Sequence, residues 1–325
     1  MGAANLTRHV FNNQLVSQLG LNILKYYPDF KFNNFKTYIG IFDDSITLNE
    51  RLNLITNALT KYMPKDFCES AQIIKKTLPQ YDKTDNNWNQ FIWMPVSNFV
   101  ARNGCNEKYL STSFDLLKEI TKHFTCEYAV RPFIEKFEKE TINQFKIWTA
   151  NKNQNIRRLV SEGSRPRLPW ARQIKIFKEN PLPCLELLQI LRNDDSKYVQ
   201  KSVANHMNDI LKTNPKIALN FLRKWKKENN TNTNWIIKHA LRNELKKGNI
   251  EALKIQGFSL SPKIEISEFS LSDKVVKIGD SIKFSFTLTN SGYITENLII
   301  DYVCFFMKKN GKQYPKTFKI TNKEL

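Results

Sequence analysis

The sequence predicts a mainly α-helical protein, a solenoid of HEAT-like helix pairs that is followed by a small all-β region. Three segments, which begin at Asn155, Tyr198 and Trp235, resemble one another. Each has a β-branched residue second, a basic residue fourth and an apolar residue sixth, and they recur about every 40 residues, as helix pairs do in such arrays. Beyond residue 257 the pattern changes to alternating, β-branched stretches between glycine and asparagine turns.

The chain before these segments also has helical periodicity. Residues 5–64 carry two apolar stripes, one with a spacing of four from Phe11 to Ile23 and one with a spacing of three or four from Leu48 to Leu59, and the second stops before Pro64. Further helices are expected at 67–78, 109–121, from 124, at 137–149, 183–191 and 215–225. Each helix pair needs its neighbours to bury its apolar face, so a stacked array follows.

The tail contains four or five candidate strands, at 264–267, 281–289, 298–306 and 317–320. An immunoglobulin-like sandwich has about seven strands over roughly 100 residues, so this region is a reduced or incomplete one. We therefore expect two domains, residues 1–257 and 258–325.

Charge and cysteine content narrow the class of protein. The formal net charge of +19 favours an anionic partner, either nucleic acid or an acidic membrane surface, although a general lysine and asparagine bias would also produce it. The five scattered cysteines form no C-x-x-C pair, and no metal-ligand spacing is present. Without a signal-like start or a long apolar run, we expect a soluble, monomeric cytoplasmic protein.

Residues 155–170 are the most distinctive stretch. Gly163, Pro166 and Pro169 should end the helix that begins near Asn155, because glycine costs backbone entropy and proline lacks an amide donor. A short helix then leads into a stiff loop that ends at Trp170. The stretch holds four arginines: Arg157, Arg158, Arg165 and Arg167. It either grips phosphates and presents an aromatic ring, or connects two helices with arginines capping carbonyls and the tryptophan in the core.

The second repeated segment carries a polar helix face. Ser202, Asn205 and Asp209 stand at i, i+3 and i+7, with Val199, Val203 and Ile210 further round on the side expected to be buried. Asp209 is a candidate catalytic carboxylate, and its alternative role is a helix-end ion pair with Lys212.

Four blocks together resemble the AlkC-type alkyl-DNA glycosylases, a branch of the HEAT-like-repeat DNA glycosylases, some of which carry an immunoglobulin-like domain. The blocks are residues 124–133, 156–170, 198–209 and 234–242. The resemblance implies a DNA repair enzyme that acts on double-stranded DNA without a cofactor. It implies hydrolysis of the N-glycosidic bond of cationic bases such as 3-methyladenine and 3-methylcytosine, without the full base flipping that most glycosylases use.

Such a reaction needs acidic and aromatic groups on a basic surface. A cationic base leaves readily, and the oxocarbenium-like sugar that remains is stabilised by a fixed carboxylate. With the resemblance, the predicted catalytic residues are Asp209 first, Glu127 second, and Trp170 as the aromatic contact. Glu127 also stands four residues before Arg131, the spacing of a simple intrahelical ion pair.

The predicted DNA-binding residues are Arg157, Arg158, Arg165, Arg167, Lys201, Ser202 and Asn205. Glu162 is expected to orient the arginines, Trp148 to lie in the core, and His206 and His239 to be hydrogen-bonded histidines of the core or groove. Two other classes remain open: a HEAT-repeat protein that binds nucleic acid without catalysis, and a protein-binding scaffold that has no use for the arginine-rich loop.

Overall fold

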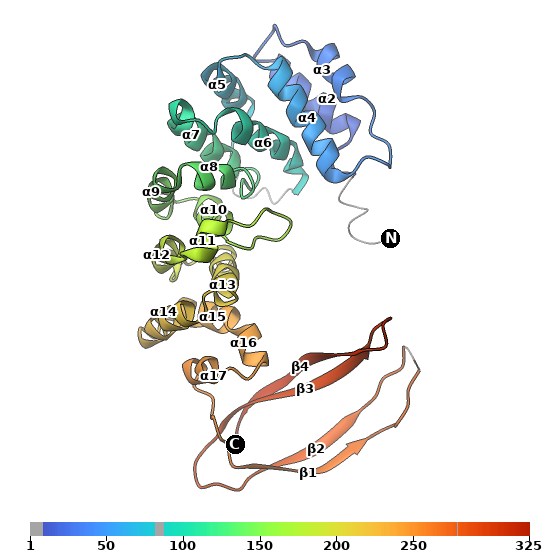
Figure 1. Cartoon of the computed structure of the whole chain (residues 1–325). Coiled ribbons are helices and arrows are strands. Elements are labelled where there is room, and N and C mark those ends of the chain that lie inside the picture. The colour runs from blue at the N-terminus through green and yellow to red at the C-terminus, as the bar shows by residue number, and fades with distance from the viewer. Residues whose placement is uncertain (1–8, 82–87, 278) are drawn as a thin grey trace. The chain divides into compact units, whose positions relative to one another are not determined.

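A computed structural model describes residues 9–81, 88–277 and 279–325 of the chain, and the predicted fold class is confirmed. Helices occupy the chain as far as residue 256, and strands follow (Figure 1). The chain divides into two compact units, residues 1–214 and 215–325. The first eight residues, on which the expectation about a targeting signal depends, lie outside the described residues.

The first unit begins with the helices that the apolar stripes predict. Phe11, Leu19 and Ile23 are buried on one stripe, and Ile55 and Leu59 are buried on the other. A capping box of Thr47 and Glu50 begins the third of these helices, because the two side chains bond each other's backbone amides. The helices are α2 (Asn13–Leu24), α3 (Phe32–Ile39), α4 (Leu48–Tyr62), α5 (Phe67–Thr77), α6 (Trp93–Asn103) and α7 (Leu110–Thr121), with short 3-10 turns η1 (Trp88–Ile92) and η2 (Glu107–Tyr109).

The rest of this unit places α10 against α13. The remaining helices are α8 (Arg131–Lys136), α9 (Glu138–Trp148), α10 (Gln154–Gly163), α11 (Lys175–Glu179), α12 (Leu182–Leu191) and α13 (Lys197–Leu211). As predicted, α10 ends at Gly163, where a Cβ atom would lie 2.5 Å from Val130 Cγ2. The close approach requires glycine and brings the end of α10 against the start of α8. Trp148 is buried in the core, as predicted.

The second unit contains both helices and strands. Its helices are α14 (Pro215–Lys227), α15 (Thr231–Ala240), α16 (Arg242–Lys246) and α17 (Ile250–Gln256). Gly257 then ends α17 in the left-handed conformation, with φ 77°, which glycine adopts without strain. The change from helix to strand thus occurs where the sequence predicts it, whereas the compact units divide at 214, so the predicted domain boundary stays a prediction.

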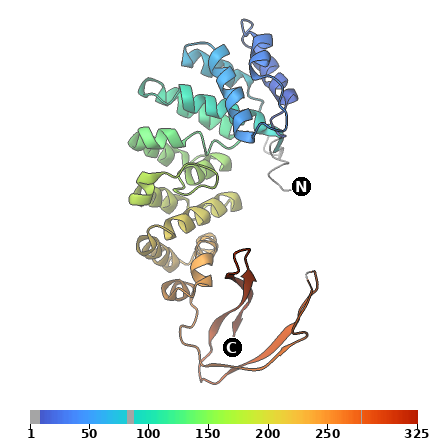
Figure 2. The ribbon, with the colours of Figure 1, turned by 45° about the vertical axis from the view of Figure 1, so that its right-hand side comes forward.

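The strands form two antiparallel hairpins (Figure 2). β1 (Ile264–Leu271) pairs with β2 (Phe284–Asn290), and β3 (Asn297–Met307) pairs with β4 (Gln313–Glu324). The register shifts between Ser267 and Ser270 in the first pair and between Ile300 and Asp301 in the second. Within the described residues, no helix combines the length and the apolar character that crossing a bilayer requires.

Candidate active site

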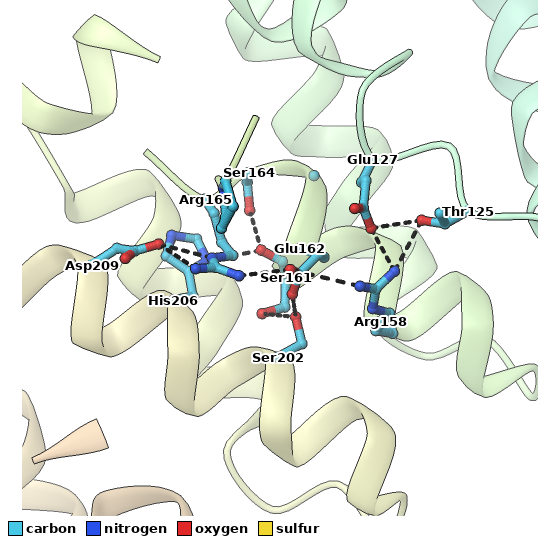
Figure 3. A network of polar contacts seen from close by, with 12 residues as sticks. Thr125, Glu127, Arg158, Ser161, Glu162, Ser164, Arg165, Ser202, His206 and Asp209 are labelled. Carbon is cyan, nitrogen blue, oxygen red and sulfur yellow. Dashed lines mark hydrogen bonds and ion pairs between the residues drawn. The ribbon is translucent and has the colours of Figure 1, made fainter. Parts of the chain in front are cut away.

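A layer of buried polar side chains lies between α10 and α13 (Figure 3). Ser202, His206 and Asp209, at i, i+4 and i+7 on α13, all bond to α10 or to the residues that follow it. The polar face of α13 is therefore buried as well as the apolar side that the sequence predicts to be buried: Ser202 and Asp209 are 3% and 2% exposed. The end of α10 is itself polar, so it supplies partners that apolar periodicity does not reveal.

Arg165 joins two of the carboxylates. Its Nε and Nη2 atoms each lie 2.8 Å from Asp209 Oδ2, and its Nη1 donates to Glu162 Oε1 at 2.6 Å. Burial disfavours a charged guanidinium, but the two carboxylates outweigh it and raise the pKa of Arg165 above its ordinary value. Asp209 also pairs with Lys212, Nζ to Oδ1 at 3.2 Å, so the helix-end ion pair named as its alternative role is present too.

Arg158 organises the other side of the layer. Its Nη1 donates to Glu127 Oε2 at 2.6 Å and to Thr125 Oγ1 at 2.9 Å, while its Cζ lies 4.8 Å from the ring centre of Tyr198. Burial acts to lower the pKa of Arg158, but nearby carboxylates, chiefly Glu127, raise it above the usual value. Arg158 therefore stays charged and holds a carboxylate and an aromatic face together.

Glu162 connects the two arginines. Its Oε1 accepts from Arg165 and lies 3.6 Å from Arg158 Nη2, and its Oε2 accepts from Ser202 Oγ at 2.6 Å. The expectation that Glu162 orients the arginines is confirmed for Arg158 and Arg165. The connected network contains three carboxylates and two guanidinium groups: Glu127, Glu162, Asp209, Arg158 and Arg165. Lys212, which pairs with Asp209, supplies a third cation, so the positive and negative charges of the network balance.

The two candidate acids differ in what their oxygens do. Both oxygens of Asp209 accept from cations, Oδ1 from Lys212 and Oδ2 from Arg165. Glu127 uses only Oε2, for Arg158 and Thr125, and its Oε1 makes no hydrogen bond with the described parts of the chain. An oxygen without a bond is able to face a ligand or orient a water molecule, so Glu127 is better placed than Asp209 for direct contact.

His206 is a fully buried member of the layer, and the prediction of a hydrogen-bonded core histidine is confirmed. Its Nδ1 donates to the carbonyl oxygen of Ser161 at 2.9 Å. Within residues 9–81, 88–277 and 279–325, Nε2 has no partner. Burial, reinforced by the charges of Arg165 and Arg131, lowers the pKa of His206 to about 3, so the imidazole is neutral at physiological pH.

Trp170 stands apart from the core. Its side chain is 95% exposed, so the interpretation in which it fills the core is wrong. Its backbone has φ 63°, the left-handed region that costs a non-glycine residue roughly 1–2 kcal/mol. The loop that carries it projects between α10 and α11 (Figure 1). An exposed aromatic ring on a strained backbone is typical of a ligand-contacting position.

Arg131 does not form the predicted intrahelical pair with Glu127. Its guanidinium donates instead to the backbone carbonyls of Gly163, Arg165 and Arg172, at the two ends of the loop that carries Trp170. Glu127 instead forms an ion pair with Arg158 of α10. The intrahelical pair fails because Glu127 lies in a turn before α8, which begins only at Arg131.

The predicted phosphate ligands fall into two groups. Arg167 and Lys201 are exposed. Arg157 binds Asp194 with Nε and Nη2, at 2.5 and 2.9 Å from its two carboxylate oxygens, so it has a structural role of its own. Arg165 and Ser202 likewise bond inside the layer, and Asn205 is half-buried beside it. Contact with DNA stays a prediction for all seven residues.

Sequence reasoning missed Thr125, Tyr198 and Ser161. Thr125 and Tyr198 contact Arg158, and Ser161 bonds Ser202 and His206, so these contacts join residues at least 33 positions apart. Within the described residues, no group of three or more His, Cys, Asp or Glu side chains is arranged to hold a metal ion. The groups considered for the chemistry of the site are therefore its carboxylates, arginines and aromatic rings.

Known proteins resemble this chain in sequence and in fold. The model of a family described as DNA alkylation repair enzyme matches residues 100–243, which include the whole polar layer. A second model, the C-terminal Ig-like domain of the uncharacterised protein YhaZ, matches residues 265–325. The chain is 36% identical over 315 residues to the uncharacterized protein YhaZ of Bacillus subtilis, covering 97% of this chain and 85% of that protein.

A solved structure is similar over nearly the whole chain. It is that of the Pseudomonas fluorescens alkylpurine DNA glycosylase AlkC bound to DNA containing an abasic site analog. The TM-score is 0.87 and the identity 29%, over 98% of this chain and 86% of that one.

Proposed function

Because this chain belongs to the AlkC-type DNA alkylation repair enzymes and is a DNA glycosylase, we propose that it releases cationic N-alkylated bases from double-stranded DNA. The substrates are of the 3-methyladenine and 3-methylcytosine type, and the bond hydrolysed is the N-glycosidic bond. The enzyme works from the sugar edge without full base flipping. It acts as a monomer, in the cytoplasm and on nucleoid DNA.

The observation that carries the proposal is a buried network of fixed carboxylates, one of which, Glu127, has an oxygen without a hydrogen bond among the described residues. The exposed Trp170 lies in the loop that follows α10. A cationic base leaves without strong acid catalysis, and the sugar then becomes oxocarbenium-like. Carboxylates held in place by Arg158 and Arg165 stabilise that charge without reorganising during the reaction. Trp170 offers its ring face to the cationic base or sugar.

The two acids have different parts in this mechanism. Glu127, with Oε1 unbonded among the described residues, faces the sugar or orients the attacking water. Asp209, bonded to Arg165 and Lys212, contributes negative charge without contacting the sugar and keeps Arg165 in place. The sequence ranks Asp209 first, and the hydrogen bonds favour Glu127 for direct contact.

Excision from methylated duplex DNA tests the proposal. We expect Glu127→Gln to fold normally and to lose about 100- to 1000-fold in the rate of base release, as loss of an electrostatic group typically does. Asp209→Asn keeps the shape of the side chain and serves as the comparison. If both variants release bases at the wild-type rate, the carboxylates are structural and the proposal is wrong.

Binding tests the DNA partner separately. All seven predicted residues are proposed DNA contacts: Arg167 and Lys201 are exposed, and Arg157, Arg158, Arg165, Ser202 and Asn205 are more buried. Each neutralised phosphate adds about 0.9 to the slope of log affinity against log salt. Arg167→Ala should reduce the slope by about one, with Arg223→Ala, outside the site, as control. Salt-dependent binding without any base release would favour a non-enzymatic nucleic-acid-binding protein.

A further inference from the structure

The position of Trp170 depends on the loop that carries it. We call residues 163–172, from the last residue of α10 to Arg172, the tryptophan loop. Because the Trp170 side chain is almost fully exposed, packing does not hold the ring, and its location follows from the path of the backbone. Pro166 and Pro169 restrict that path, and Ile174 N donates to the carbonyl of Pro166 at 3.2 Å.

One buried side chain joins the two ends of this loop. Arg131 Nη1 donates to Gly163 O at 3.1 Å and to Arg165 O at 2.9 Å. Arg131 Nε donates to Arg172 O at 3.1 Å, and Nη2 bonds the same oxygen. A single planar guanidinium therefore closes the loop at its base, and a lysine, with one point-like ammonium group, has no equivalent fork.

The Arg131 side chain is fixed by the packing of the helix that carries it. Arg131 is the first residue of α8 and only 5% exposed, and Phe133 and Ile134 of the same helix are fully buried. Gly163 O lies at the carboxyl end of α10, where the helix dipole attracts a cation. On the outer part of the loop, Tyr128 Oη donates to Pro169 O at 3.4 Å, one residue before the tryptophan.

We propose that Arg131 is a positioning residue for base excision, which acts by holding the tryptophan loop so that Trp170 is already placed for its ligand. The inference rests on the proposed function of Trp170. A loop closed at its base loses less conformational entropy when DNA binds, and a ring that is displaced by about 1 Å costs on the order of 100-fold in rate. Tyr128 supports the same loop from the side.

A double-mutant cycle separates positioning from general stability. Base release from methylated duplex is measured for wild type, Arg131→Met, Trp170→Ala and the double variant, below the melting temperature of the least stable. We expect Arg131→Met to lower kcat about 10- to 100-fold. In the Trp170→Ala background the same change should cost less than about threefold, because contacting residues that act as a unit are not additive.

The outcomes distinguish the two claims. If Trp170→Ala retains full activity, the proposed role of Trp170 is wrong and the inference falls with it. Suppose that Trp170→Ala is impaired and that Arg131→Met lowers the rate of base release by the same factor in that background as in the wild type. Then only the inference about Arg131 is overturned. Should Arg131→Met fail to fold, Tyr128→Phe replaces it. That variant removes one hydroxyl, and we expect a loss of about three- to tenfold that disappears in the Trp170→Ala background.

Discussion

The layer between α10 and α13 and the two C-terminal hairpins distribute polar and apolar groups in opposite ways. In the layer, Glu162, Arg165 and Asp209 are buried although they are charged. In the hairpins, Phe269 and Phe305 are more than half exposed although they are aromatic. The contrast teaches that burial in this chain follows the partners that neighbouring elements offer rather than the hydrophobicity of each residue.

Each case has a physical cause. A buried charge is tolerated when an opposite charge and hydrogen bonds replace water, and every carboxylate of the layer meets a guanidinium. A two-stranded sheet offers few neighbours to its side chains, so its apolar face stays accessible. Partners are abundant where helices pack and scarce along a hairpin.

The sharpest test of this contrast removes one partner from the layer. Arg165→Leu would remove the buried cation that Asp209 and Glu162 share, so that Asp209 would keep Lys212 and Glu162 would keep the more distant Arg158. Loss of one partner from a buried ion pair typically costs 3–5 kcal/mol of the free energy of unfolding. Urea denaturation of the wild type and the variant measures it. Arg167→Leu, exposed in the same loop, is the matched control and should stay within about 0.5 kcal/mol. Equal effects would show that the layer is not energetically distinct.

A second test uses pH. The folded protein keeps His206 neutral down to a pKa of about 3, whereas the unfolded chain takes up a proton below its ordinary pKa of 6.5. Because the unfolded state then binds more protons, stability falls as pH falls. From pH 7.5 to 5.5 the loss attributable to His206 is about 1.4 kcal/mol. His206→Asn should lack this part of the pH dependence, and identical profiles for the two proteins would contradict the buried neutral state.

A third test addresses the strain at Trp170. Glycine adopts the left-handed region freely, so Trp170→Gly should raise the free energy of unfolding by about 0.5–1 kcal/mol, after the entropy cost of glycine is subtracted. Base release should fall at the same time. Trp170→Ala loses the same ring but keeps the strain, so it should lose activity without gaining stability. A Trp170→Gly protein less stable than the alanine variant would rule out backbone strain.

The smallest effect is expected from removing the hairpins. If the helices bury one another, a protein ending at Gly257 should remain soluble and helical by circular dichroism, with a melting temperature close to that of the full chain. A protein ending at Asn214, where the compact units divide, is the comparison. Should the longer fragment precipitate while the shorter one folds, the boundary lies at 214 and not at 257.

Much of the fold follows from local sequence. Gly163, Pro166 and Pro169 determine where α10 ends, and Gly257 marks the change from helices to strands. The members of the site were also recognisable, since Glu127, Arg158 and Asp209 stand in blocks of the family type. These features depend on residues close together in the chain, where periodicity and backbone preferences act directly.

Only the tertiary structure decided how these residues combine. Glu127 forms its ion pair with Arg158 and not with Arg131. The polar face of α13 packs against α10, and Trp170 lies outside the core. The partners of Arg158 and Asp209 in these contacts lie 31 and 44 residues away along the chain. Ion pairs and hydrogen bonds across helices depend on packing between distant segments, and periodicity within one helix carries no information about the face that its neighbour presents.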